Sequence, residues 1–457
     1  MRSVLSGPPS TASDSTVKGT WLLVAGLAVF AVGLAGYVAY AVTHPKSFTL
    51  DPVDLAVYRS GGLIVRHVRP LYDPHLAVPL YDWASRGHLP FTYTPFAAIA
   101  FVGVSLLPWW LCQQVSLAVD IVALLAAMWL TAGGLGYAGR IRAGAALLGT
   151  AAVYWTEPVQ RTMYLGQVNL VLMALIIWDL TQPDTPRSRW WKGFATGVAA
   201  GVKLVPLIFI PYLLLARKFR QAAMACAGFA FTVLLGFAVL PRDSSAWWFG
   251  GLFAQSGRTG FPGWAGNQSV DGLITRLAGS VAAGRPAWAA AAVLSGAAGV
   301  VAAAVLDRKG HGMLAVLMAA LTGLLISPIS WDHHWVWIAP GAMTAVYYAV
   351  RAARRGARTA AVACGIAAAA IVVWFASWPT SLFGARPHLG HDSLGLIWIP
   401  PNTPPGDYLW HGDQPGYAEY HWHGLELITG NAYILAGLAA FGVLLLVSVV
   451  SRQPESR

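Results

Sequence analysis

The side chains most capable of chemistry in this sequence interrupt long apolar stretches. The clearest group is Asp332, His333 and His334, which stands between two apolar runs. Adjacent residues on a helix point about 100° apart, whereas a pair of metal-binding histidines prefers a spacing of three or four residues. His333 and His334 are therefore predicted to bind a phosphate or a hydroxyl group through hydrogen bonds, without a metal ion.

A lysine interrupts another apolar run, in the segment 201–206. A charged group at membrane depth is costly unless it faces a cavity or a partner, so Lys203 is a candidate functional residue. Pro206 breaks the helix here, and phosphate is a natural partner for a lysine at a broken helix. The alternative is that Lys203 extends to the lipid headgroups and has no role in a site.

A carboxylate placed for proton transfer is Asp54, which follows the first apolar run on a short amphipathic stretch. There it could accept a proton from a bound hydroxyl group as a general base. It could equally cap a helix or pair with Arg59. The spacing alone does not decide between these interpretations.

A polar bend at 157–169 separates two further apolar runs. Gln167 and Asn169 are expected to start the next helix, where backbone N–H groups and the helix dipole favour an anion. Capping and hydrogen bonds between helices explain these two residues equally well. Polar residues of this bend and of a later segment are candidates for binding an acceptor, namely Glu157, Arg161, Asn267, Gln268 and Arg276.

Lipid must be the solvent for much of this chain. Of its 457 residues, 56% are apolar and 11% are charged, against roughly 25% charged in a typical soluble domain, and the mean hydropathy is +0.57. The net charge of +11 does not indicate nucleic-acid binding, because Lys and Arg form short clusters between apolar runs, as in cytoplasmic loops. The three cysteines lack the spacing of disulfide frameworks or zinc sites.

The apolar runs predict an all-α polytopic membrane protein. Basic clusters and the long polar segments should lie on opposite sides of the bilayer. A single crossing at 193–216 would break this rule, so we predict two short helices that meet near the outer side at Lys203, and a re-entrant or interfacial segment at 95–108. About twelve transmembrane helices follow. The apolar runs are 21–42, 95–108, 112–134, 142–156, 166–180, 193–216, 221–239, 286–305, 312–328, 333–350, 359–378 and 430–450.

The predicted organisation puts both chain ends in the cytoplasm and the candidate residues on the extracytoplasmic face, where we expect the active site. The third outer loop (379–429) contains His411, Asp413, His421 and His423, which could suggest a metal. Its Trp and Tyr residues would equally form a platform for binding a carbohydrate. The parts are a polar cytoplasmic N-terminus (1–20) before an uncleaved first span, a catalytic transmembrane core (21–350) with outer loops 43–90 and 241–285, C-terminal spans (351–450) with outer loop 379–429, and a cytoplasmic tail (451–457).

In this order, the motifs resemble those of the actinobacterial polyprenol-phosphate-mannose-dependent α-(1→2)-mannosyltransferases, of glycosyltransferase family 87 in the GT-C superfamily. The resemblance covers about 50–350, and the last third shares only the presence of spans and a loop. The matching stretches are Val53-Asp54-Leu55 with Val57-Tyr58, Leu89-Pro90-Phe91-Thr92-Tyr93 with Pro95-Phe96, Trp155 with Glu157-Pro158, Gly166-Gln167-Val168-Asn169, Gly201-Val202-Lys203-Leu204 with Pro206, Asn267-Gln268-Ser269, and Ser327-Pro328-Ile329-Ser330-Trp331 with His333-His334-Trp335-Val336-Trp337.

The resemblance implies a GT-C fold, an extracytoplasmic site and a catalytic base at the acidic residue after the first span, here Asp54. It implies polyprenyl phosphate mannose as donor and a mannosylated glycolipid as acceptor, such as phosphatidylinositol mannoside, lipomannan or lipoarabinomannan. The sequence departs from the family at Asp332, where relatives often carry a neutral residue, and in the loop 379–429. The residues expected at the donor phosphate and sugar are Lys203, His333, His334, Gln167, Asn169 and Tyr58.

Mannosyl transfer is also reasonable chemically. A monophosphate leaving group carries less charge than a diphosphate, so cationic side chains could stabilise it without a metal or other cofactor. One displacement by a deprotonated 2-hydroxyl group would convert a β-mannosyl phosphate into an α-mannoside. The alternatives are an arabinosyltransferase of the same superfamily, a non-catalytic partner in polymer export, and a transporter or flippase, which would place charges near the midplane in two corresponding halves.

Overall fold

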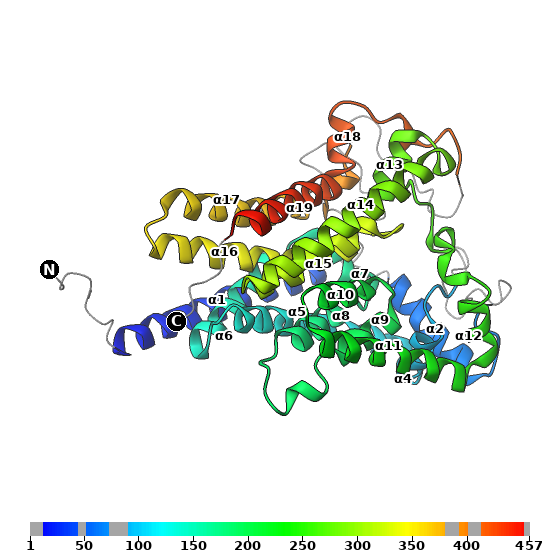
Figure 1. Cartoon of the computed structure of the whole chain (residues 1–457), viewed down its shortest axis with the longest axis horizontal. Helices are drawn as coiled ribbons and strands as arrows, with labels where there is room; N and C mark the ends of the chain where they lie inside the picture. The colour runs from blue at the N-terminus through cyan, green and yellow to red at the C-terminus, as the bar shows by residue number, and fades with distance from the viewer. Residues whose placement is uncertain (1–11, 44–51, 73–89, 380–392, 401–412, 452–457) are drawn as a thin grey trace.

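A computed structural model describes residues 12–43, 52–72, 90–379, 393–400 and 413–451 of the chain. Helices make up most of these residues, which confirms the predicted all-α class (Figure 1). One small antiparallel pair joins strands β1 (Trp378–Pro379) and β2 (Ser393–Leu394). The predicted outer segments 43–90 and 379–429, the predicted tails 1–20 and 451–457, and His411 lie partly or wholly outside the described residues.

Five described helices are long and apolar enough to cross a bilayer, for which about 20 residues are needed. A sixth span would combine α7 (Glu157–Leu165) and α8 (Asn169–Thr181), which meet at 114°. The chain is therefore a multi-pass membrane protein, and the predicted count of about twelve spans stays a prediction. The five helices are α1 (Ala12–Thr43), α5 (Trp109–Gly134), α11 (Phe219–Val239), α14 (Val281–Arg308) and α19 (Ala432–Val450).

The remaining helices are shorter. The run predicted as re-entrant or interfacial forms α3 and α4, which are too short to cross the bilayer. The shorter α-helices are α2 (Val53–Arg66), α3 (Pro95–Ala100), α4 (Val102–Ser105), α6 (Gly139–Val153), α9 (Phe194–Val202), α10 (Phe209–Leu215), α12 (Pro241–Trp248), α13 (Val270–Ala278), α15 (Gly312–Ile326), α16 (Ile338–Arg354), α17 (Arg358–Trp374) and α18 (Leu425–Thr429). Short 3₁₀ turns are η2 (Ser188–Trp190), η3 (Val205–Ile208), η4 (Leu252–Ala254), η5 (Ser256–Thr259), η6 (Asp332–Trp337), η8 (Leu396–Trp398) and η9 (Ala418–His421).

The predicted break at Lys203 is confirmed, because α9 ends at Val202 and the chain continues into η3 and α10. Small residues let α9 approach α11 closely. A Cβ atom on Gly201 would lie 2.2 Å from the Thr232 hydroxyl oxygen, so a larger side chain would separate the two helices. Small residues at crossings are typical of helix packing in membranes.

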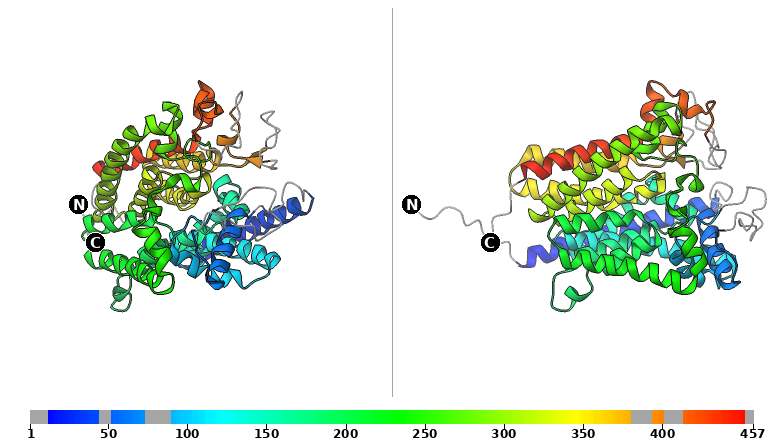
Figure 2. Two further views of the ribbon diagram at one scale, coloured as in Figure 1. Left: turned by 90° about the vertical axis from the view of Figure 1, so that its right-hand side faces the viewer. Right: turned by 45° about the vertical axis from the view of Figure 1, so that its right-hand side comes forward.

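The long helices run side by side, and the two ends of the bundle differ (Figures 1 and 2). The helices α2, α12 and α13 gather at one end. The first turns of α1, the last turns of α19 and the basic turn between α16 and α17 lie at the other end. The basic turn and the polar segment 241–285 are thus separated by the length of the bundle, as the charge pattern predicts.

Candidate active site

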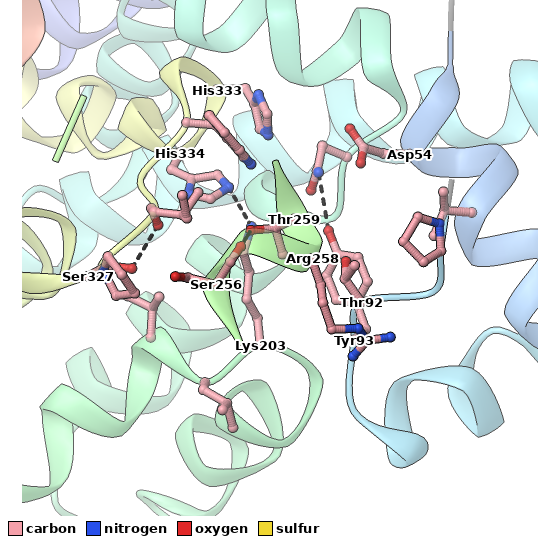
Figure 3. Close-up of a pocket in the computed structure, with 18 of the residues that line it drawn as sticks. Asp54, Thr92, Tyr93, Lys203, Ser256, Arg258, Thr259, Ser327, His333 and His334 are labelled. Carbon is pink, nitrogen blue, oxygen red and sulfur yellow. Dashed lines mark hydrogen bonds between the residues drawn. The ribbon is translucent and has the colours of Figure 1, made fainter. Parts of the chain in front are cut away.

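A cavity of about 730 Å³ opens among segments that are far apart in the sequence. Its walls come from α2, the bend between α7 and α8, the break after α9, the loop 252–259 and the segment 327–334. Six residues predicted for the site line it together (Figure 3 shows four of them), namely Asp54, Arg161, Gln167, Lys203, His333 and His334.

The sharp bend between α7 and α8 brings Gln167 to the cavity. Gly166 has a φ of 66°, a left-handed conformation that glycine adopts without strain, and a Cβ atom there would lie 2.7 Å from that of Leu55. The Gln167 side chain accepts a hydrogen bond from the Tyr58 hydroxyl (2.7 Å) and donates one to the Tyr93 hydroxyl (3.2 Å). Tyr58 itself is buried behind Gln167, so its direct contact with a donor stays a prediction.

Lys203 sits at the break after α9 with two neutral partners. Its ammonium nitrogen lies 2.9 Å from Asn169 Oδ1 and 2.8 Å from His334 Nε2. Because an ammonium group only donates, His334 Nε2 must accept, and the neutral ring carries its proton on Nδ1. These two contacts would use two of the three protons of an ammonium group, and Lys203 also lines the cavity (Figure 3). Lys203 and His334 together form a site suited to an anion.

The two histidines have different partners although they are adjacent. Their rings lie 4.8 Å apart at 87° to one another. His333 Nδ1 lies 2.9 Å from Asp332 Oδ1. The His333 carbonyl group accepts hydrogen bonds from Thr162 on α7 and Asn169 on α8, so both halves of the bent helix pair hold η6 in place.

Asp54 is the second residue of α2, and Pro52, not Asp54, occupies the helix cap. Its half-buried carboxyl group faces the cavity. Burial raises the pKa of Asp54, while His333, Gln167 and Lys203 act in the opposite direction. A general base works best when its pKa approaches the operating pH, so the raised pKa suits Asp54 for this role.

Four predicted acceptor-binding residues do not line the cavity: Glu157, Asn267, Gln268 and Arg276. Glu157 accepts hydrogen bonds from the Trp398 indole (3.0 Å) and the Tyr433 hydroxyl (2.9 Å). The Asn267 side chain accepts one from the backbone N–H of Ser330 (2.9 Å). These contacts give both residues buried partners within the protein, and direct acceptor binding by them stays a prediction.

Gln268 and Arg276 fasten the start of α19 to the rest of the molecule. Gln268 accepts from the backbone N–H groups of Tyr433 and Ile434 and donates to the Gly430 carbonyl. Arg276 donates twice to Asn431 Oδ1, at 2.9 and 2.6 Å. Both side chains are almost completely buried. The last third of the chain, which shows little resemblance to the family, is therefore joined to the residues around the cavity.

Sequence reasoning missed several residues of the cavity wall. Arg258 donates to the Phe91 carbonyl group (3.1 Å) and lies over the Tyr72 ring. It is a basic residue in a predicted outer loop, against the usual charge bias of such loops, and this signal could have identified it. Other residues of the wall that were not predicted as site residues are Thr92, Tyr93, Tyr164, Ser256, Thr259, Ser327 and Trp331. Asp332, which the sequence analysis grouped with the two histidines without giving it a role, also lines the wall.

Comparisons with known proteins identify the family of the chain. The profile of glycosyltransferase family 87 matches residues 91–328. A polyprenol-phosphate-mannose-dependent alpha-(1-2)-phosphatidylinositol pentamannoside mannosyltransferase of Mycobacterium tuberculosis is 35% identical over 69% of this chain and 70% of its own length. A protein of the same description from Mycolicibacterium smegmatis is 33% identical over 88% of this chain and 86% of its own length.

Another relative from Mycobacterium tuberculosis, described as a polyprenol-phosphate-mannose-dependent alpha-(1-2)-phosphatidylinositol mannoside mannosyltransferase, is 33% identical over 71% of this chain and 74% of its own length. No solved structure matches the chain. Since the family profile covers more than half of the 457 residues and the relatives match most of the chain, the protein belongs to glycosyltransferase family 87.

Proposed function

We propose that this protein transfers mannose from polyprenyl phosphate mannose to a phosphatidylinositol mannoside, with inversion, and forms an α-(1→2) linkage. The observation that carries the proposal is that a candidate base, Asp54, and an anion site, Lys203 with His334, face one cavity. The names of the relatives support the donor and the class of acceptor. Lipomannan and lipoarabinomannan carry similar mannosyl ends and are the further acceptors to test.

The reaction needs one base and one stabilised leaving group. Asp54 takes the proton of the acceptor 2-hydroxyl group, and the oxygen attacks C1 of the mannose. The bond between C1 and the phosphate oxygen breaks, and polyprenyl phosphate leaves with the electron pair. A single displacement at a β-linked donor makes the product an α-mannoside. The reaction leaves Asp54 protonated and the phosphate with one more negative charge.

The increase in negative charge on the phosphate explains the need for Lys203. A charge-assisted hydrogen bond from a buried ammonium group strengthens as the phosphate becomes more negative, so it stabilises the transition state more than the bound donor. Behind Lys203 and His334 lies a small crevice with apolar walls that include Leu172, Phe209 and Trp337. An apolar surface next to an anion site suits a donor that joins a phosphate to a lipid.

We also propose that the cavity faces the extracytoplasmic side, within a catalytic core at 21–350 that is followed by C-terminal spans at 351–450. The basic turn between α16 and α17 lies at the end of the bundle opposite α12 and α13 (Figure 1), and basic turns favour the cytoplasm. The contacts of Gln268 and Arg276 support a core and C-terminal spans that work as one unit.

The test is mannosyl transfer by purified protein in detergent. Polyprenyl phosphate [¹⁴C]mannose is incubated with phosphatidylinositol mannosides, lipomannan or lipoarabinomannan, and the anomeric configuration and linkage of the product are determined by NMR. We expect a labelled α-(1→2)-mannoside. In a parallel reaction with polyprenyl phosphate [¹⁴C]arabinose, transfer of arabinose without transfer of mannose would identify an arabinosyltransferase and refute the proposal. Movement of lipid-linked mannose across vesicles without any transfer would indicate a flippase and refute the proposal.

A further inference from the structure

Asp332 and His333 form a buried pair that the transfer mechanism leaves without a role. Both residues line the cavity, and their side chains are 3% and 7% exposed. The His333 ring is held through Nδ1 by Asp332, while its Nε2 atom has no hydrogen-bond partner among the described residues. A carboxylate on one ring nitrogen favours the doubly protonated, cationic ring.

His333 lies where a positive charge on its ring would act on Asp54. Figure 3 shows both side chains at the same part of the cavity wall. Among the charged groups around the Asp54 carboxylate, His333 attracts it most strongly, ahead of Lys203 and Arg161. His334 does not share this geometry, because its Nε2 atom accepts from Lys203. The different partners of the two histidines thus divide their roles.

Asp332 contacts two residues of α7, and one of them is bound in turn by the last third of the chain. Arg161 Nε lies 3.6 Å from Asp332 Oδ2, and the Glu157 carboxyl group also interacts with that of Asp332. Glu157 is in turn fixed by hydrogen bonds from Trp398 and Tyr433. The family profile matches residues 91–328, so Arg161 and Glu157 lie within the matched part of the chain. Asp332, Trp398 and Tyr433 lie beyond it.

We propose that Asp332 is a positioning residue that acts through His333: it keeps the imidazole ring cationic and directed at Asp54, so that the buried base is ionised before the acceptor binds. This inference rests on the proposed function, since it requires Asp54 to be the base. The charged or titratable side chains facing Asp54 are His333, Lys203, Arg161, Tyr58 and Tyr93. Those facing the Asp332–His333 pair are Arg161, Glu157, His334, Tyr433 and Asp54.

The sign of the effect separates this role from the alternatives. Asp332→Asn removes an anion, and an anion acting directly on Asp54 would have made that base harder to ionise. If Asp332 acted directly on Asp54, the Asp332→Asn substitution would therefore move the acid limb of the kcat/KM profile to lower pH. If Asp332 acts through His333, the ring becomes neutral, Asp54 loses its strongest cation, and the limb moves to higher pH. A neighbouring charge typically shifts a pKa by about one to three units.

The experiment measures pH profiles of kcat/KM for mannosyl transfer in the full-length protein. We expect Asp332→Asn and His333→Gln each to move the acid limb upward by about one unit or more, and the double variant to move it no further. At pH values below the acid limb, kcat/KM for Asp332→Asn should thus be about tenfold lower than for the wild type. The difference should disappear as the pH rises. The control Asp271→Asn removes a buried carboxyl group on α13, outside the cavity wall, and should leave the limb unchanged.

Several results would overturn the inference. A downward shift in Asp332→Asn, an unchanged limb in both variants, or a shift in only one of them would each exclude action through His333. If Asp332→Asn does not fold, His333→Gln alone decides, and an unmoved limb rejects the proposal. Full activity of Asp54→Asn would instead refute the base assignment in the proposed function, and with it this inference. An inactive Asp54→Asn with unmoved limbs in the other variants would refute only the inference.

Discussion

Replacing Asp54 with Asn tests the catalytic base directly. The amide has nearly the shape of the carboxylate and keeps hydrogen-bonding capacity toward Gln167, but it cannot accept the proton of the acceptor hydroxyl group. General-base catalysis typically contributes about 10²–10⁴ in rate, which corresponds to about 2.7–5.4 kcal/mol of transition-state stabilisation. We therefore expect kcat for [¹⁴C]mannose transfer to fall by at least about 100-fold, with a donor KM close to that of the wild type.

The same substitution has a predictable effect on stability. Because burial raises the pKa of Asp54, the folded state binds this proton more tightly than the unfolded state does. The carboxyl group therefore contributes stability at acid pH that is lost as the pH rises through the folded-state pKa. Asp54→Asn does not titrate, so its unfolding temperature in detergent should rise relative to wild type as the pH increases from about 4 to 8.

Two controls make the result specific. Asp243→Asn alters another carboxylate at the same end of the bundle, one that accepts a hydrogen bond from the Leu71 backbone N–H and does not line the cavity, and it should keep most of the activity. Thermal unfolding verifies that Asp54→Asn is folded. Normal transfer by folded Asp54→Asn would refute the assignment of Asp54 as the base. If the Glu157→Gln variant, assayed in parallel, were inactive, Glu157 would be the base instead.

Three further experiments test other parts of the structure. Lys203→Met should lower kcat/KM for the donor by about 10- to 100-fold, because a charge-assisted hydrogen bond contributes about 1.5–3 kcal/mol; the control Lys218→Met breaks an ion pair with Asp307 outside the cavity wall and should leave kcat/KM unchanged. Arg276→Met should lower the unfolding temperature in detergent and expose the junction with α19 to proteolysis, since buried acceptors such as Asn431 Oδ1 lose their donor; an unchanged unfolding temperature would contradict this. In a background without the native cysteines, Ser245→Cys should react with an impermeant thiol reagent on intact cells and Ala353→Cys only after permeabilisation, and the reverse pattern would invert the proposed orientation.

The sequence alone determined the class of protein and much of the site. Too few charges to cover a soluble surface required a lipid environment, and a lysine followed by a proline within an apolar run predicted the break at Lys203. These inferences succeed because they depend on composition and on local backbone chemistry. The prediction that Lys203 binds a phosphate followed from the cost of a charge at membrane depth. That argument needs no knowledge of the neighbouring helices.

Only the tertiary structure decided which polar residues face the cavity. Gln268 and Arg276 have the sequence signature of ligand-binding residues, yet each makes hydrogen bonds to residues more than 150 positions away. Arg258 and Asp332 reach the cavity wall through loops whose course the local sequence does not specify. A buried polar side chain needs a partner, and a ligand or a distant carbonyl group satisfies it equally well. Local sequence therefore shows that a partner is required, and the packing of distant segments determines which one it is.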